Sequence, residues 1–332
     1  MEKKTVIQGR DLCIGYRTGK KENRVHKHLQ FTLHAGELTC LLGANGTGKS
    51  TLLRTLSAAQ PALEGELLLM NKPLSEYSEK ERSRTIGVVL TDKTFTGGLT
   101  VFELVALGRQ PHTGFFGRLT KEDKRIVQEA MEQVGIDHKA RSYTAELSDG
   151  ERQKAMIAKA LVQECPLILL DEPTAFLDVV SRIEIMHLLH RLAAEQQKAI
   201  LLSTHDIEQA LLLSDRLWLL SREHGLQCGI TEDIILNHHM DKLFPHNDIR
   251  FDTTHGVYSP TINKGIPVTL EAEDETLHHW TANALTRQGY ITSDTHCDIR
   301  LQAVSAQELR LTKKGETRVC SSFEELLSEI QL

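Results

Sequence analysis

The chain has 332 residues, of which 40% are hydrophobic and 25% are charged, and its formal net charge is -6. This length is ample for one large α/β domain and a small second one, and the interspersed charges give no basic patch, so nucleic-acid binding is not expected. The six cysteines are far apart and form no CxxC pair, as in reduced cytosolic thiols rather than zinc sites. Because no stretch approaches 18 apolar residues, we expect any membrane role to come through a partner.

Alternating apolar and polar residues at 5–16 and 28–34 predict antiparallel strands before the first glycine-rich loop. Tyr16 ends the first of them. Its ring could stack on an adenine, or it could be an ordinary half-buried strand residue, and its spacing alone does not decide between the two.

Gly43-Ala44-Asn45-Gly46-Thr47-Gly48-Lys49-Ser50-Thr51 matches the P-loop pattern, with a buried strand predicted at 38–42 and a helix at 49–58. Glycines let backbone N–H groups surround a phosphate, and the helix N-terminus favours the anion. Lys49 would reach the β- and γ-phosphates, and the Ser50 hydroxyl would ligate Mg²⁺. The sequence therefore predicts a nucleotide-phosphate site made by Gly43, Asn45, Gly46, Gly48, Lys49, Ser50 and Thr51.

After the P-loop, the apolar pattern predicts strands at 65–70 and 85–90, a helical insertion over about 92–165, and strands at 167–172 and 198–203. Helices are expected within the insertion at 101–108, 121–134 and 150–163. Strands that alternate with helices predict a mainly parallel sheet.

Asp171 and Glu172 end an apolar run. In a P-loop protein, Asp171 fits the acid that holds Mg²⁺ and Glu172 the residue that polarises the attacking water. Taken alone, an apolar run that ends in two acids is a weak signal and also fits a strand that enters a solvated turn. The P-loop upstream favours the catalytic interpretation.

Between the P-loop and Asp171 lies the signature loop, Leu147-Ser148-Asp149-Gly150-Glu151-Arg152-Gln153. This order of motifs resembles the ATP-binding cassette (ABC) family of ATPases over roughly residues 5 to 240. The resemblance implies a P-loop NTPase fold of ABC type, with a mainly parallel sheet, an antiparallel β subdomain and a helical subdomain. It also implies ATP and Mg²⁺ as cofactors.

By the same resemblance, the signature loop closes over ATP held by a second copy of the chain, so one copy cannot complete a site. The implied residues are Ser148, Asp149, Gly150 and Glu151 in the signature, Asp178 in the loop that couples the two sites, and His205 as the residue that contacts the γ-phosphate. An ordinary strand-end histidine is the alternative for His205. Gly150 opens an apolar-periodic helix, which agrees with an anion at its N-terminus.

Two departures from the family pattern concern the hydrolysis cycle. The signature usually reads Leu-Ser-Gly-Gly-Gln, but Asp149 and Glu151 bring carboxylates to this loop. We expect Asp149 to point outward and to cap free N–H groups. Thr91 stands where the family has a γ-phosphate-sensing glutamine, and it is too short for that reach unless a water intervenes.

Leu99 to Pro111, here called the coupling segment, resembles a stretch of iron-siderophore, haem and cobalamin importer ATPases. The resemblance implies a groove for an integral membrane permease dimer, supplied by an extracytoplasmic binding protein, at the cytoplasmic face of the inner membrane. Glu103 and Arg109 are the candidate permease contacts. A plain amphipathic helix packed within the insertion is the alternative.

The residues after the cassette are predicted as a separate domain, which gives a division into 1–245 and 246–332. The second part is expected to be a small α+β unit with strands at 268–270 and 299–301, a hairpin over 308–320, and helices at 279–288 and 322–330. Its role is either regulatory or dimer-stabilising, or it is an appended packing domain. Histidines 238, 239, 246, 255, 278, 279 and 296 lack metal-ligand spacing and are read as surface residues rather than a metal or haem sensor.

The sequence therefore favours the ATP-hydrolysing subunit of an importer. A soluble cassette ATPase that assembles or remodels a protein complex is the alternative, and the departures at Thr91 and Asp149 also leave open a weakly catalytic, nucleotide-gated scaffold.

Overall fold

The computed structural model describes residues 3–19, 21–90, 98–114, 117–244, 249–261, 264–293, 295 and 297–331. Unit 1 comprises Met1–Pro245 with Phe251–Val257, and unit 2 comprises His246–Arg250 with Tyr258–Leu332. The boundary predicted at residue 245 places Phe251–Val257 in the second domain, whereas these residues belong to unit 1. Phe251 is buried, and its N–H donates a hydrogen bond to Asp241 Oδ1 at 3.3 Å. Within these described ranges, no helix is long and apolar enough to cross a membrane.

The N-terminal part of unit 1 is an antiparallel sheet with strand order β2-β1-β4-β5. Its strands are β1 (Thr5–Thr18), β2 (Lys21–His34), β4 (Glu64–Leu69) and β5 (Lys72–Pro73). The predicted strands are confirmed, but β2 begins earlier than expected. In this added stretch an ion pair joins β2 to its neighbour β1, with Arg17 Nη2 2.9 Å from Glu22 Oε1. A second ion pair joins β2 to β4, with Arg24 Nη2 2.6 Å from Glu64 Oε1.

The larger sheet of unit 1 has strand order β10-β9-β3-β8-β7-β6. Its strands are β3 (Leu38–Leu42), β6 (Ile86–Val89), β7 (Leu167–Asp171), β8 (Ala199–Ser203), β9 (Arg216–Ser221) and β10 (Gly225–Ile230). Every neighbouring pair is parallel except β9 and β10, which confirms the mainly parallel sheet. Because the carboxyl ends of parallel strands lie at one edge, the segments that follow β3, β7 and β8 meet there.

A hydrophobic core joins both sheets of unit 1 to helix α1 (Lys49–Leu56). Trp218 of β9 is fully buried in this core, and its ring centroid lies 4.8 Å from that of Phe31 of β2. The core therefore fixes α1, and with it the loop that precedes α1. Unit 1 also contains α2 (Glu79–Ser83), α6 (Val179–Gln196), α7 (Ile207–Leu213), α8 (Thr231–Leu236), η1 (Leu74–Glu76) and η5 (Met240–Lys242), where η marks a 3₁₀ turn.

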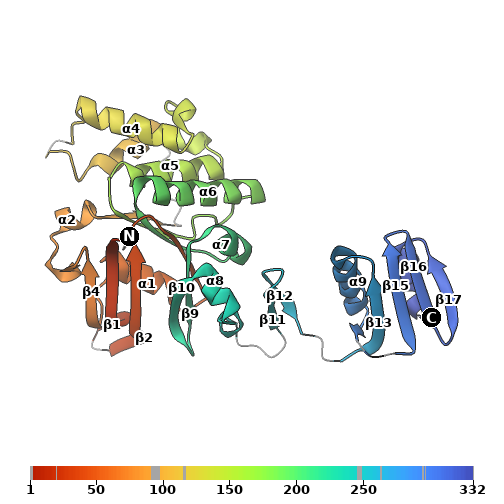
Figure 1. The fold of residues 1–332 in the computed structure, drawn as a ribbon. Coiled ribbons are helices and arrows are strands. Elements are labelled where there is room, and N and C mark those ends of the chain that lie inside the picture. Colours follow the sequence, from red (N-terminus) through yellow and green to blue (C-terminus); the bar gives the residue numbers. More distant parts are fainter. Residues whose placement is uncertain are drawn as a thin grey trace. The chain divides into compact units, whose positions relative to one another are not determined.

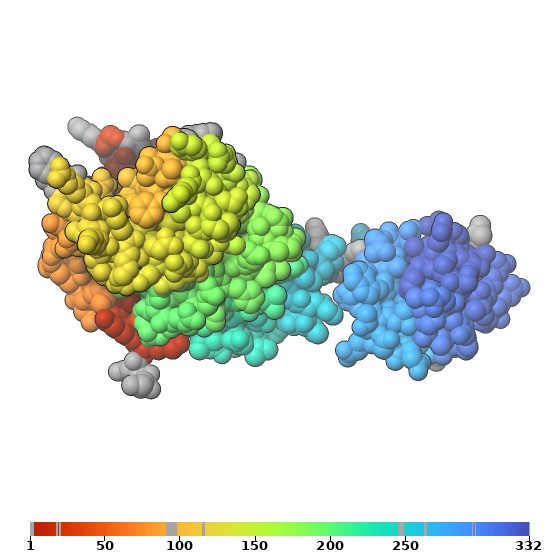
Figure 2. All heavy atoms as spheres, turned by 90° about the horizontal axis from the view of Figure 1, so that it is seen from above, coloured from red at the N-terminus to blue at the C-terminus, as the bar shows by residue number. Residues whose placement is uncertain are grey.

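A helical segment follows β6 in the chain and precedes β7. It contains α3 (Val101–Ala106), η2 (Leu107–Arg109), α4 (Lys121–Gln133), η3 (Asp137–Lys139), η4 (Thr144–Glu146) and α5 (Asp149–Leu161). The three predicted helices are confirmed, and each begins with a capping box, whose N-caps are Thr100, Thr120 and Ser148. Figure 1 shows α3, α4 and α5 grouped on one side of unit 1, with α6 beside α5. On the face seen in Figure 2, the yellow atoms of this segment form a continuous surface.

Unit 2 contains a five-stranded sheet with order β14-β13-β15-β16-β17. Its elements are β13 (Ile266–Ala272), α9 (Glu275–Arg287), β14 (Tyr290–Thr292), β15 (Ile299–Ser305), β16 (Glu308–Lys313), β17 (Glu316–Cys320) and α10 (Phe323–Gln331). The predicted strands, hairpin and helices are confirmed, and the short strand β14 was missed. Apolar side chains from the sheet and both helices form a separate core. The two-stranded sheet of β11 (Ile249–Asp252) and β12 (Val257–Pro260) spans the boundary between the units in sequence.

Candidate active site

The P-loop lies between β3 and α1, and a side chain would clash with neighbouring atoms at two of its glycines. A Cβ atom on Gly43 would lie 2.5 Å from the carbonyl oxygen of Leu220, and one on Gly48 would lie 2.6 Å from a methyl carbon of Val25. Gly48 also has φ +102, in the left-handed region that favours glycine. The backbone therefore turns sharply enough for α1 to begin at Lys49, directly after the loop.

Lys49 is buried at the start of α1. Its Nζ donates hydrogen bonds to the carbonyl oxygens of Gly43 at 2.7 Å and Ala44 at 3.4 Å. Burial lowers the pKa of the Lys49 ammonium, and the carboxylates of Glu172 and Asp171 act in the opposite direction. The loop therefore contains a partly desolvated cation, which an oligophosphate would stabilise.

Two acids and a histidine lie at the edge of the sheet beside Lys49. Glu172 Oε1 lies 2.8 Å from His205 Nε2, which is 3.5 Å from Lys49 Nζ. The Ser203 hydroxyl donates to Asp171 Oδ1 at 2.6 Å and accepts the N–H of Glu172 at 3.0 Å. The structure thus brings together Lys49, Asp171, Glu172 and His205, four side chains that the sequence assigned to one site.

The remaining nucleotide-site residues lie in the same loop, in the first turn of α1 and on β1. Asn45, Gly46 and Ser50 are exposed, Thr51 is half-buried in the first turn of α1, and Tyr16 is 51% exposed at the end of β1. This exposure leaves the Tyr16 ring accessible, and its stacking on an adenine stays a prediction. The sensor position predicted at Thr91 lies outside the described residues.

The signature loop caps helix α5. The N–H of Glu151 donates to Ser148 Oγ at 3.2 Å, while the N–H of Ser148 donates to Glu151 Oε2 at 2.9 Å. This bond to the Ser148 N–H is the largest cause of the lowered pKa of Glu151. Glu151 therefore has a local structural role, since its carboxylate completes the capping box.

The sequence predicts that Asp149 caps α5. In the structure, Ser148 occupies the N-cap position, one residue before Asp149. The Asp149 side chain is exposed, as expected, and its Oδ1 accepts a hydrogen bond from Arg152 Nη1 at 3.1 Å. This ion pair, three residues apart on the helix surface, offsets the negative charge of Asp149.

Asp178 caps α6 beside the signature loop of the same chain. Its carboxylate accepts hydrogen bonds from the N–H and the hydroxyl of Ser181, both at 2.9 Å. A Cβ atom on Gly150 would lie 3.1 Å from Ser181 Oγ, so the signature loop and the first turn of α6 are in close contact. The side chain of Phe176, in the same loop as Asp178, is 80% exposed.

The two candidate permease contacts differ in exposure. Glu103 is exposed, but its carboxylate accepts the N–H and hydroxyl of Thr100, both at 2.8 Å, and so belongs to the capping box of α3. Arg109 is buried and bonded within the helical segment, which does not fit a direct contact with a permease. The predicted permease contact of Arg109 is therefore corrected: its guanidinium is held inside unit 1.

Sequence reasoning missed Ser203 and His26. Ser203 lies opposite Asp171 in the register of β8 and β7, so alignment of the two apolar runs could have identified it. His26 Nε2 lies 2.6 Å from the carbonyl oxygen of Thr47 in the P-loop, and no local pattern marks that contact. Among the residues described, no cluster of three or more His, Cys, Asp or Glu side chains could hold a metal ion on its own.

Two family models match the chain: the ABC transporter model over residues 26–175 and the iron ABC transporter C-terminal domain model over residues 265–331. The ferric enterobactin transport ATP-binding protein FepC of Escherichia coli is 37% identical over 238 residues, 72% of this chain and 86% of that protein. The iron(3+)-hydroxamate import ATP-binding protein FhuC of Bacillus subtilis is 36% identical over 224 residues, 68% of this chain and 82% of that protein.

Solved structures agree with these matches. The chain resembles cbiO1 of Clostridium perfringens, part of the ABC transporter complex cbiONQ, with a TM-score of 0.62 and 28% identity over 73% of this chain and 94% of that chain. It also resembles a dimeric ATP-binding cassette in a post-hydrolysis state with ADP and Pi, with a TM-score of 0.59 and 26% identity over 68% and 98% of the respective chains. The chain belongs to the ATP-binding subunits of the ABC transporter family, and it is an ATPase.

Proposed function

We propose that this chain is the ATP-hydrolysing subunit of a membrane ABC importer for a ferric siderophore. The observation that carries the proposal is the contact series from Lys49 through His205 to Glu172, in a chain whose end matches the iron ABC transporter C-terminal domain. Relatives named for ferric enterobactin, iron(3+)-hydroxamate and petrobactin support the siderophore class over haem or cobalamin.

In this proposal, P-loop N–H groups surround the ATP phosphates and Lys49 neutralises the β- and γ-oxygens. Ser50 and Asp171 would hold Mg²⁺, since a hydroxyl and a carboxylate are the oxygen ligands that this ion prefers. The exposed Ser50 side chain and the Asp171 carboxylate, oriented by Ser203, fit that role. When bound, Mg²⁺ would neutralise charge that develops on the phosphates.

Glu172 is the proposed general base, which accepts a proton from the attacking water. His205, whose Nε2 lies 2.8 Å from Glu172 Oε1, would orient this carboxylate and contact the γ-phosphate. Ser148 of each copy would complete the site of the other. Two copies then close while ATP is bound and separate after hydrolysis.

The proposed partners are a second copy of the chain, an integral membrane permease dimer and, indirectly, an extracytoplasmic binding protein that delivers the chelate. The chain would sit at the cytoplasmic face of the membrane, peripherally, through the permease. No observation favours the alternative of a soluble cassette that remodels a protein complex.

The test is uptake by vesicles that contain the permease and this subunit. Ferric hydroxamate, ferric catecholate, haem and cobalamin would each be offered with their binding proteins, with the Glu172→Gln subunit as the matched control. We expect ATP-dependent uptake of one ferric siderophore class by the wild-type complex and little uptake by the variant. A subunit that hydrolyses ATP but associates with no membrane permease would contradict the proposal.

A further inference from the structure

We propose that Arg109 is a positioning residue that joins the coupling segment to the far end of the signature helix α5, so that the two move together. The inference rests on the proposed function, since it assigns a role to Arg109 in the response of the ATPase to the permease. Arg109 contacts neither nucleotide nor partner in this proposal. It acts through α5, whose opposite end bears Ser148.

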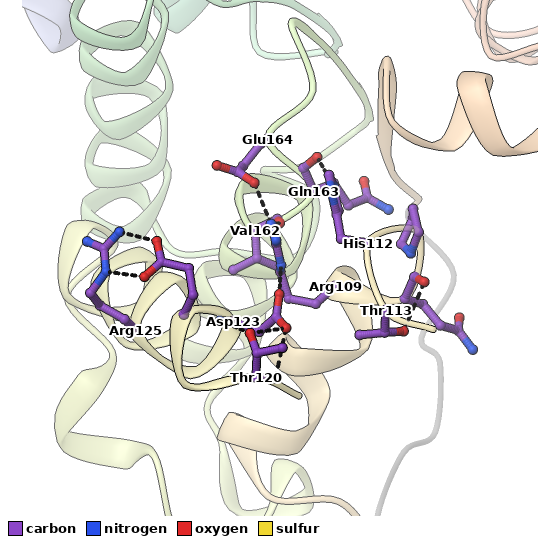
Figure 3. A network of polar contacts seen from close by, with 12 residues as sticks. Arg109, His112, Thr113, Thr120, Asp123, Arg125, Val162, Gln163 and Glu164 are labelled. Atoms are coloured by element: carbon purple, nitrogen blue, oxygen red, sulfur yellow. Dashed lines mark hydrogen bonds and ion pairs between the residues drawn. The ribbon is translucent and has the colours of Figure 1, made fainter. Parts of the chain in front are cut away.

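The Arg109 guanidinium forms a dense set of contacts, drawn in Figure 3. Its Nε donates to Asp123 Oδ1 at 2.9 Å, and its Nη1 donates to the carbonyl oxygen of Val162 at 2.7 Å and to Glu164 Oε2 at 2.5 Å. The Arg109 side chain is only 7% exposed. One side chain therefore connects η2, the first turn of α4 and the end of α5.

Asp123 is held from its other side. Asp123 Oδ2 accepts the Thr120 N–H at 2.9 Å and the Thr120 hydroxyl at 2.7 Å, which completes the capping box of α4. These bonds to Thr120, followed by those to Arg109, lower the pKa of Asp123. The carboxylate that receives the guanidinium is thus fixed and charged at neutral pH.

The carbonyl groups of Val162, the C-cap of α5, and of the next residue receive donors from the coupling segment and the residue that follows it. Carbonyl groups at a helix C-terminus lack intrahelical donors and form the negative end of the helix dipole. Here Arg109 donates to Val162, and His112 Nε2 lies 3.0 Å from the carbonyl oxygen of Gln163. One short stretch therefore supplies two side-chain donors to the turn that ends α5.

The backbone approach at η2 is equally close. A Cβ atom on Gly108 would lie 2.1 Å from the carbonyl oxygen of Lys159 and 2.4 Å from a methyl carbon of Val162. Glycine thus lets η2 rest directly on α5. Because α5 has 13 residues, a displacement of η2 would be carried about 20 Å to the signature loop.

The test compares Arg109→Met and Arg109→Lys with Arg125→Met in the complex with the permease. Arg125 lies on α4, is exposed and pairs with Glu122 and Glu129, so its loss controls for removal of a cation from the same subdomain. Lysine restores charge but not the planar fork that reaches several acceptors, so both Arg109 variants should behave alike.

For both Arg109 variants we expect ATPase stimulation by the permease to fall about fivefold or more, a coupling loss of ordinary size. Basal ATPase activity, ATP affinity and co-purification with the permease should stay within about twofold of wild type, as should every property of Arg125→Met. Unchanged ATPase stimulation by the permease in Arg109→Met would overturn this inference and leave the proposed function standing. If the Arg109 variants fold at least in part, a fall of all activities only in proportion to the folded fraction would also overturn it, since that is the result of a merely structural role.

His112→Ala decides the matter if the Arg109 variants do not fold, because it removes only the second cap. Stimulation should then fall about twofold with basal activity unchanged, and undiminished stimulation would overturn the inference. If the wild-type subunit is not stimulated by any permease, the proposed function fails first and the inference fails with it.

Discussion

Lys49 provides the most direct test of the nucleotide site. Its ammonium is buried among carbonyl groups, so Lys49→Ala should weaken ATP binding by about 30- to 150-fold, the loss of about 2–3 kcal/mol typical of a bond to a charged group. Arg54→Ala is the matched control, because it removes an exposed cation from the same helix α1. Equal ATP affinities for the two variants, measured by titration calorimetry, would contradict the assignment of the P-loop lysine.

The lowered pKa of Lys49 also predicts a pH effect. The lysine loses its proton at lower pH than usual in the free protein, and ATP phosphates would return its pKa upward. ATP binding should therefore take up a proton, and affinity should fall as pH rises through the range just above the lowered pKa. In the free protein, burial of the charged lysine lowers the free energy of unfolding at low pH. This cost is lost as the pH rises through the lowered pKa toward the pKa of the unfolded chain. Calorimetry in two buffers of different ionisation enthalpy measures the uptake, and its absence from Lys49→Ala identifies the group.

Glu172→Gln should leave ATP binding intact and slow hydrolysis by about 100-fold or more, because an amide can orient water but cannot accept its proton. The ATP-bound dimer should then outlive that of the wild type in size-exclusion experiments. Glu208→Gln, an exposed acid on the neighbouring helix α7, controls for loss of charge near His205. Equal turnover by Glu172→Gln and wild type would mean that another residue is the base.

At the scale of elements, Glu103 combines a predicted permease contact with a structural role. Glu103→Arg removes the capping box of α3, which should cost about 1 kcal/mol of stability, whereas Glu103→Gln can keep the box. Weaker co-purification of Glu103→Gln with the permease would therefore report the charge contact alone. If only Glu103→Arg weakens association, the effect comes from the helix start and the contact lies elsewhere.

The elements differ in how far the sequence predicts them. Helix starts such as Ser148 with Glu151 are local signals three residues apart, and the meeting of Lys49, Asp171 and Glu172 follows from the geometry of a parallel sheet. The burial of Arg109 was not predictable, because its partners Val162 and Glu164 lie 53 and 55 residues away in the chain. An arginine in a partly apolar helical stretch gives no local sign of which helix end it will cap.

At the scale of the whole molecule, the two units have separate cores and should unfold in separate steps. ATP binds unit 1 only, so at about 100 times its dissociation constant it should stabilise that unit by about 2.7 kcal/mol, a shift of roughly 5–10 °C. Calorimetric scans with and without ATP measure both transitions, with Lys49→Ala as the control. A single transition that ATP moves as a whole would contradict independent folding of the units.

The placement of the two tryptophans gives each unit its own optical reporter. The chain has two Trp residues. Trp218 in the core of unit 1 is 0% exposed, and Trp280 on α9 of unit 2 is 60% exposed. Fluorescence from Trp218 should therefore be blue-shifted and insensitive to iodide, while that from Trp280 should be red-shifted and readily quenched. Iodide added to the folded chain would quench the Trp280 fluorescence of unit 2 and leave the Trp218 fluorescence of unit 1. The unfolding of unit 1 could then be followed without any label or truncation.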